Sequence, residues 1–575
     1  MNPRRLWVVV LILVVGGVTV VARAVQVTVV DGELWRDRAH RQHEQVIKVP
    51  GPRGTIRTAD GYILATSLER VAIQANTLLL NDPELFARAA APLLGLDGDD
   101  LVERLTDGPR TVWLAKQASQ ETGEAVRELA PTAVVLVPDF ARVYPLGTLA
   151  APVVGFVGRE ELQMVGRAGL EYHYDEALAG EPQTFLAVND AIQRKVRLER
   201  LERGRDGCDL ELTLNSRLQA VCEIELQRAV KELRADAASA VVLDLRTGAL
   251  LALGSVPSFD PAAPGLVQEQ WRLRPVQDAM EPGSTVKPVV VAAALSGESV
   301  RPGERFDCFA HGTRLAGFWI RDHVAPGRYT IDEVVAYSAN AGIIEIVERI
   351  PQEHLYRTFS AFGFGRRSEI DYPAEARGLM PEVGTWSKLS RAGFALGQEL
   401  TVTPLQVALA YAAIANGGWL PAPFLVNRAD AEDVSMPSNR SCRARVLDEA
   451  LAARLTDMLE AAVEDGTGKE ARIPGFRVAG KTGTAQRVVN GGFDDEHHVA
   501  WFAGFLPLPD PRMVIVVAVE NPRADFWAST AAAPVFARIA EAAAGYLDLA
   551  PDSAGLGVVR MARTDETAHP RGGGV

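Results

Sequence analysis

The fold of this chain is decided by the stretch Glu281-Pro282-Gly283-Ser284-Thr285-Val286-Lys287-Pro288. Ser284 and Lys287 are three residues apart, so on a helix their side chains lie on one face, within reach of each other. A neutral amine in that position can take the proton of a serine hydroxyl and so activate it as a nucleophile. The ring of Pro288 would clash with the carbonyl of Ser284 inside a helix, so we expect the helix to begin close to Ser284. Free N–H groups at a helix start favour developing negative charge.

Length and composition describe a large globular chain of several domains. At 575 residues the chain is too long for one core, and roughly two to four domains are expected. The net charge of −13 argues against a nucleic-acid-binding protein, which needs a basic surface. The four cysteines have no metal-like spacing, and we expect buried free thiols at Cys208, Cys222, Cys308 and Cys442.

The N-terminus carries an uninterrupted apolar run at residues 6–22, directly after Arg4 and Arg5. Its length is near the lower limit for spanning a bilayer, and the arginines predict that the N-terminus stays in the cytoplasm. A cleaved signal peptide is the alternative, because Ala22-Arg23-Ala24 has the small-x-small form of a cleavage site. We favour a retained anchor, since the run exceeds the usual ~7–15-residue signal core. In both interpretations the bulk of the chain is exported.

Sequence patterns divide the chain into four segments. We expect a cytoplasmic tip and anchor at residues 1–26, a stalk and scaffold at 27–234, a catalytic domain at 235–550 and a disordered tail at 551–575. In the scaffold, Asp60-Gly61 between two β-rich runs predicts a hairpin.

In the catalytic segment, apolar arms at 240–245 and 249–253 predict a hairpin, and runs at 499–506 and 513–519 predict another. The first hairpin is apolar on both arms, so helices are expected on both faces of its sheet. Helices are predicted at 215–233, 330–337, 403–415 and 532–547, and a strand at 476–486.

Three short motifs follow one another in the catalytic segment: Ser284-Thr285-Val286-Lys287, Ser338-Ala339-Asn340 and Lys481-Thr482-Gly483. The ordered set resembles the signature of penicillin-binding proteins and serine β-lactamases, in which these motifs line one cleft. Ala339 departs from the Asp or Ser often found there, at a position that carries no chemistry in the family pattern.

The resemblance covers most of the chain, from about Gly51 to Leu547, and is closest to class B penicillin-binding proteins. The other stretches on which the resemblance rests are Arg53-Gly54-Thr55-Ile56, Gly155-Phe156-Val157-Gly158, Gly169-Leu170-Glu171, Gly397-Gln398-Glu399 and Ala532-Ala533-Pro534-Val535-Phe536. It implies a multidomain α+β fold: a transmembrane helix, an elongated α/β pedestal of the dimerisation type, and a transpeptidase domain with a mainly antiparallel sheet flanked by helices. No stretch resembles the glycosyltransferase domain of class A relatives.

The resemblance implies a role for each residue of the motifs. Ser284 attacks the D-alanyl-D-alanine bond of a peptidoglycan stem peptide, and Lys287, whose pKa is lowered by burial and by nearby Lys481, is its base. Ser338 relays protons, and Asn340 holds Lys287 and the substrate amide. Lys481, Thr482 and Thr484 suit the terminal carboxylate. Gly483 is expected to keep the strand bare for substrate and Gly283 to let the backbone approach a ligand. Backbone N–H groups of Ser284 and Thr484 form the oxyanion hole.

The implied function is cross-linking of stem peptides through a serine acyl-enzyme, inhibited by β-lactams, on the outer side of the cytoplasmic membrane. Asn521-Pro522-Arg523 and the compact N-terminal region resemble the septal division branch. The alternatives are an elongation-type enzyme, or a D,D-carboxypeptidase or β-lactam-binding receptor. A SEDS-type glycosyltransferase and other division proteins are the implied partners.

Two histidine-containing pairs are less informative. His497-His498 lies in a predicted strand, where adjacent side chains point to opposite faces and cannot chelate together. Asp322-His323 has no accompanying catalytic signature, and a solvated or capping histidine is expected. We therefore expect neither a metal nor a cofactor. Trp501 and Phe502 are predicted to be core residues.

Overall fold

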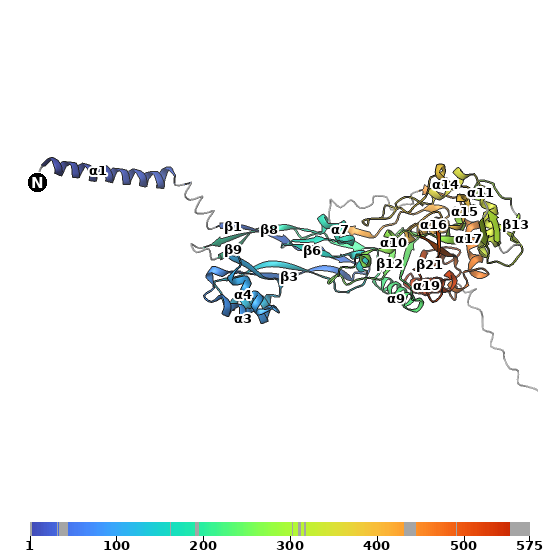
Figure 1. Ribbon diagram of the computed structural model, residues 1–575, viewed down its shortest axis with the longest axis horizontal. Helices are drawn as coiled ribbons and strands as arrows, with labels where there is room; N and C mark the ends of the chain where they lie inside the picture. Colours follow the sequence, from blue (N-terminus) through green and yellow to red (C-terminus); the bar gives the residue numbers. More distant parts are fainter. Residues whose placement is uncertain are drawn as a thin grey trace, which may run out of the picture.

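The computed structural model describes residues 3–31, 33, 44–161, 163–189, 195–301, 303–308, 312–315, 318–429, 444–489 and 492–551. The molecule is elongated, with helix α1 (Pro3–Val25) at one end and a large helix-and-sheet domain at the other (Figure 1). Residues Trp7–Val30 are long and apolar enough to cross a membrane, and their side chains are exposed. The apolar helix predicted at residues 6–22 is present. Most of the predicted stalk, the tail after Pro551 and Cys442 lie outside the described residues.

The pedestal lies between α1 and the catalytic end and is built on two larger sheets and a two-stranded one, β6 (Val157–Glu160) with β7 (Gln163–Gly166) (Figure 1). Its largest sheet contains the predicted hairpin around Asp60-Gly61, formed by β2 (Ile56–Arg57) and β3 (Ile63–Asn76). The other strands are β4 (Thr111–Ala118), β5 (Val134–Val143), β10 (Leu210–Leu212) and β18 (Val426–Ala429). The three-stranded sheet has the order β1 (Glu44–Gly51), β8 (Gly180–Asn189), β9 (Lys195–Glu202). The helices of this part are α3 (Pro83–Leu94), α4 (Gly98–Thr106), α5 (Gln120–Leu129), α6 (Ala151–Val154), α7 (Gly169–His173) and α8 (Asp175–Leu178).

A buried ion network joins distant segments of the pedestal. The Glu171 carboxylate, which is fully buried, accepts from Arg53 Nε and Arg142 Nε, each at 2.6 Å. Arg142 also donates to the Gly54 carbonyl at 2.6 Å, and Arg53 pairs with Asp175 at 2.7 Å. Two of the motifs quoted above, Arg53-Gly54 and Gly169-Leu170-Glu171, are therefore in direct contact.

The catalytic end is organised around a five-stranded antiparallel sheet of order β12-β11-β22-β21-β20. The strands are β11 (Ala237–Asp244), β12 (Leu250–Val256), β20 (Ala479–Val489), β21 (Gly492–Leu506) and β22 (Met513–Glu520). Along β11, Val241 and Leu243 face one core while Ala240 and Val242 face another. The prediction of helices on both faces is confirmed.

Each face of this sheet has its own helices. The first core receives α11 (Lys287–Ser296), α16 (Pro404–Ala415) and α17 (Glu449–Glu464). The second receives α9 (Ser216–Leu233) and α19 (Ala533–Tyr546). Smaller helices complete the domain: α10 (Arg274–Gln277), α12 (Ile331–Ala336), α13 (Asn340–Val347), α14 (Gln352–Ala361), α15 (Ser390–Leu396) and α18 (Ala528–Ala531).

Helix α9 packs on the sheet of the catalytic domain. Its apolar side chains Leu218, Cys222 and Leu226 share one core with Ala240 and Val242 of β11. The division at residues 234 and 235 assigned this helix to the pedestal. Periodicity reveals the apolar face of a helix but not the sheet that the face will cover, so the sequence did not indicate this packing partner.

The pedestal and the catalytic domain are joined by hydrogen bonds that are buried or part-buried. The Asp60 carboxylate accepts from Ser216 N at 3.0 Å and from Ser216 Oγ at 2.6 Å, at the start of α9. About two turns further along the same helix, the Glu223 carboxylate accepts from the backbone N–H of Ala150 at 2.8 Å. Tyr372 donates its hydroxyl to Pro152 O at 2.6 Å.

Candidate active site

Ser284 lies in a single 3₁₀ turn, Gly283–Val286, that runs directly into α11. In such a turn residues three apart are eclipsed, so Ser284 and Lys287 lie on the same side of the backbone. Pro288 occupies the first turn of α11, where its missing N–H costs no hydrogen bond. The expected helix start close to Ser284 is confirmed, with a 3₁₀ turn in place of a regular first turn.

Two buried aromatic residues hold the backbone of this turn. Tyr411 on α16 donates its hydroxyl to Thr285 O at 2.9 Å, and Trp501 on β21 donates its indole N–H to Glu281 O at 2.9 Å. Both side chains are almost completely buried. Trp501 is in the core as predicted, whereas sequence reasoning did not single out Tyr411. A tyrosine within the apolar helix 403–415 was the available signal, because a buried hydroxyl needs a partner.

Gly283, just before the first motif, and Gly483, in the third, allow close backbone packing. A Cβ on Gly483 would lie 2.7 Å from Pro282 O, so β20 contacts the serine turn directly. Gly283 has a φ of +54° and lies against Thr484 O. We had expected these glycines to make room for a ligand. The structure gives both a steric reason that does not involve one.

Lys287 is completely buried, and its amine contacts the second motif. Its Nζ lies 2.7 Å from Ser338 O, 2.8 Å from Asn340 Oδ1 and 3.2 Å from Ser338 Oγ. Burial lowers the pKa of Lys287 to about 7, against the opposing influence of Asp322 and Cys308. A neutral amine has two N–H groups for the two carbonyl oxygens and a lone pair that can accept the Ser338 hydroxyl proton. The geometry therefore accommodates a neutral Lys287.

The second motif lies between two short helices. Helix α12 begins with a capping box of Thr330 and Glu333, and α13 begins at Asn340. Between them Ser338 has a φ of +62°, a conformation that costs a non-glycine residue energy. The Asn340 Nδ2 donates to Arg321 O at 3.0 Å, which turns the amide so that its oxygen faces Lys287.

Asp322 is a residue of this site that sequence reasoning missed. Its buried carboxylate accepts from Ala341 N at 2.7 Å and so caps α13 beside Asn340. We had considered it only as a partner of His323, whose ring instead contacts Trp527 edge-on with 5.2 Å between centroids. His498, from the pair first tested as metal ligands, stacks on Phe526.

The third motif lies on β20, at the edge of the five-stranded sheet. Lys481 is completely buried, and its Nζ donates to Thr482 O at 3.2 Å and to Thr467 Oγ1 at 3.3 Å. Burial and the charge of Lys287 hold the pKa of Lys481 well below its usual value. We had expected the repulsion between the two lysines to lower the pKa of Lys287, and the structure shows this effect on Lys481. Thr484 Oγ1 accepts from Ala528 N at 3.2 Å.

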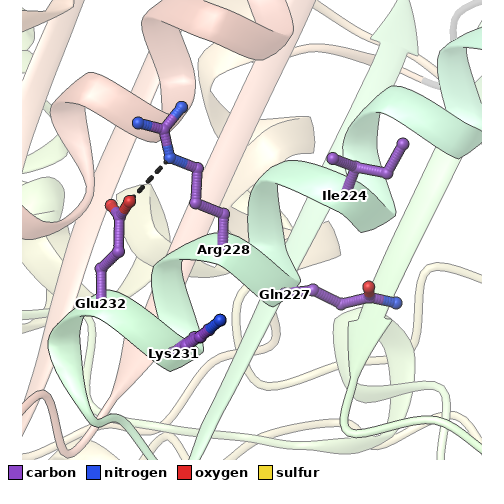
Figure 2. A pocket seen from close by; sticks show the side chains of 5 residues that line it. All are labelled: Ile224, Gln227, Arg228, Lys231 and Glu232. Carbon is purple, nitrogen blue, oxygen red and sulfur yellow. Dashed lines mark hydrogen bonds and ion pairs between the residues drawn. The ribbon is translucent and has the colours of Figure 1, made fainter.

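The structure thus brings the three motifs together. Lys287 links the serine turn to Ser338 and Asn340, and Gly483 packs β20 against the same turn. A separate hollow of about 520 Å³ lies on α9 (Figure 2). It is lined by Ile224, Gln227, Arg228, Lys231 and Glu232, with Arg228 and Glu232 paired at 2.8 Å, and contains none of the motif residues.

Comparison with known proteins identifies two parts of the chain. Residues 238–541 match the penicillin-binding protein transpeptidase domain, and residues 48–212 match the penicillin-binding protein dimerisation domain. In fold, the chain is similar to a crystal structure of penicillin-binding protein 3 from Mycobacterium tuberculosis in complex with aztreonam. The TM-score is 0.66 with 27% identity, covering 88% of this chain and 99% of that one.

Two curated relatives are similar over most of their length. The chain is 31% identical over 519 residues to peptidoglycan D,D-transpeptidase FtsI of Escherichia coli, covering 88% of this chain and 86% of FtsI. It is 31% identical over 503 residues to stage V sporulation protein D of Bacillus subtilis, covering 85% and 77%. The chain belongs to the class B penicillin-binding proteins, the family of peptidoglycan D,D-transpeptidases.

Proposed function

We propose that this protein cross-links peptidoglycan stem peptides through an acyl-enzyme on Ser284, and that β-lactams acylate the same serine. The observation that carries the proposal is the position of Lys287. Its amine is buried, lies on the same side of the 3₁₀ turn as Ser284, and contacts both Ser338 and Asn340. A pKa of about 7 gives such an amine a substantial neutral fraction at neutral pH.

In the acylation step, the Ser284 oxygen attacks the carbonyl carbon between the two terminal D-alanines. Lys287 takes the hydroxyl proton as the C–O bond forms. The C–N bond then breaks, and the leaving amine of D-alanine receives a proton through the Ser338 hydroxyl, which lies 3.2 Å from Lys287 Nζ. Backbone N–H groups of Ser284 and Thr484 stabilise the oxyanion, at about 3–4 kcal/mol per donor.

The donor carboxylate is bound by Lys481 with the hydroxyls of Thr482 and Thr484. Lys481 is a buried amine whose partners among the described residues are neutral oxygens. A bound carboxylate would supply the negative charge that a buried ammonium requires. Gly483 keeps the strand against the serine turn, and Asn340 holds Lys287 and the substrate amide.

In the second step an amine of a neighbouring stem attacks the ester, forms the cross-link and returns the proton to Ser284. A D,D-carboxypeptidase would use water instead. The reaction of purified protein with a stem-peptide thioester and a D-amino acid separates the two: a transpeptidase exchanges the amine in preference to hydrolysis. Fluorescent penicillin should label the wild type, and labelling that survives Ser284→Ala would exclude Ser284 as nucleophile.

We place the enzyme in cell division, with the N-terminus in the cytoplasm and the catalytic domain outside the membrane. The similarity to FtsI and the segment Asn521-Pro522-Arg523 support this branch, and an elongation role is the alternative. The helix α1 and the pedestal would contact a SEDS-type glycosyltransferase and other division proteins. Depletion in cells tests the assignment, because filaments indicate a septal role and round cells an elongation role.

A further inference from the structure

Thr467 contacts the third motif but belongs to none of the three. It lies in the loop after α17, and its hydroxyl oxygen is 2.6 Å from Thr482 Oγ1 and 3.3 Å from Lys481 Nζ. The loop is seated on the end of α12: Thr467 N donates to Ala336 O at 3.3 Å, and a Cβ on Gly466 would lie 2.0 Å from that oxygen. Thr467 therefore has a fixed position between the second motif and the third.

The hydrogen bonds of this cluster can be counted. A Lys481 ammonium has three N–H groups, and its three acceptors are Thr482 O at 3.2 Å, Thr467 Oγ1 at 3.3 Å and Thr482 Oγ1 at 3.4 Å. At 2.6 Å, one of the two hydroxyls donates to the other, which leaves a single hydroxyl proton for an outside acceptor. The identity of the donor decides which threonine offers that proton.

We propose that Thr467 is a positioning residue of the carboxylate site, whose hydroxyl donates to Thr482 and thereby directs the Thr482 proton to the bound ligand. Thr482 then accepts from both Lys481 and Thr467, so both lone pairs of its oxygen are occupied and its own proton points away from them. This inference rests on the proposed function of the site as the place where the donor carboxylate binds.

The arrangement supplies two donors for two oxygens. Thr482 and Thr484 are two residues apart on β20, so their side chains lie on one face of the strand. The Thr484 oxygen accepts from Ala528 N at 3.2 Å, which leaves its hydroxyl proton available as well. With Thr467 donating, two neighbouring O–H groups face a carboxylate, and hydrogen bonds to a charged acceptor are the strong kind. The bond from Thr467 polarises the Thr482 hydroxyl further.

The test uses the full-length protein in detergent and two probes: a penicillin with its free carboxylate and the methyl ester of the same penicillin. The measured quantity is the ratio of their apparent binding constants before acylation, with the acylation rate constant determined separately. Thr467→Val keeps the shape of the side chain and removes the hydroxyl, whereas Thr467→Ser keeps the hydroxyl. Thr456→Val on α17 is the matched control, because among the described residues that hydroxyl donates only to Ala452 O of its own helix, at 3.0 Å.

We expect Thr467→Val to weaken binding of the free carboxylate by about three- to tenfold and to leave the ester unchanged. Thr467→Ser and Thr456→Val should keep the wild-type ratio. An unchanged ratio in Thr467→Val, or an equal loss for both probes, would overturn the proposal. If Thr467→Val does not fold, the comparison of Thr467→Ala with Thr467→Ser distinguishes the same two outcomes. Wild-type protein that no penicillin acylates would instead refute the proposed function itself.

Discussion

The Asn340 Oδ1 lies 2.8 Å from the Nζ of Lys287, a side chain that is completely buried. An amide at this distance orients the amine without neutralising a charge. We predict that Asn340→Asp, which has nearly the same shape, places a negative charge there and raises the pKa of Lys287 by roughly one to three units. Acylation by a β-lactam at neutral pH should then fall roughly 10- to 1,000-fold and recover at alkaline pH. A pH–rate profile measures this, with Asn416→Asp as control. A uniform loss at all pH values would contradict the prediction.

Removing the charge of Asp322 should lower the pKa of Lys287, which is the opposite of the effect expected for Asn340→Asp. Its negative charge raises the pKa of Lys287, while burial lowers it, and Cys308 and Lys481 are the other titratable groups nearby. Asp322→Asn retains an acceptor for Ala341 N and removes the charge. The pKa of Lys287 should fall, so the acid limb of the acylation profile should move to lower pH. If Asp322 only capped α13, the acid limb of the pH–rate profile would stay in place in Asp322→Asn. Asp322→Ala would then lower the thermal stability alone, by about 1 kcal/mol.

Glu223 makes the junction between the two domains sensitive to pH. Burial raises the pKa of its carboxyl from 4.5 to about 7 in the folded protein, although it accepts hydrogen bonds from Gln219 and Ala150 N. The folded state therefore holds the proton more tightly than the unfolded state. Stability is highest below pH 4.5 for this group and declines as the pH rises to about 7. Glu223→Gln should flatten that decline and raise the unfolding temperature at pH 8. Thermal unfolding across this pH range measures it, and an unaltered slope would refute the assignment.

Glu171 should be essential to the pedestal. Removing its charge in Glu171→Gln leaves Arg53 and Arg142 buried with one fewer anion between them. Breaking a buried ion pair in this way costs about 3–5 kcal/mol, so the unfolding transition of the pedestal should move to much lower temperature. The matched control is Glu181→Gln, whose partner Arg205 is exposed, and we expect it to leave the transition in place. Equal effects of the two changes would contradict the prediction.

The sequence indicates the motif residues more clearly than the residues that hold the motifs in place. The sequence predicts that Ser284, Lys287, Ser338 and Asn340 lie together because short motifs keep their spacing, and helix signals such as Pro288 are local. The bond from Tyr411 to Thr285 spans 126 residues and that from Asp322 to Ala341 spans 19, and no periodicity encodes either contact. The same limit applies to α9: its apolar stripe was evident, but the sheet that it covers was not.

Helix α9 contacts both the pedestal and the sheet of the catalytic domain. This helix bonds to the pedestal through Ser216 and Glu223, and its apolar side chains Leu218, Cys222 and Leu226 pack on the sheet that contains β11 and β12. These contacts, together with β18, which the catalytic segment contributes to the pedestal sheet, hold the two parts together. The folded chain therefore holds Ser284 at a set distance from the first strand of the pedestal. Under the proposed function, that distance sets where Ser284 can meet a stem peptide relative to the pedestal.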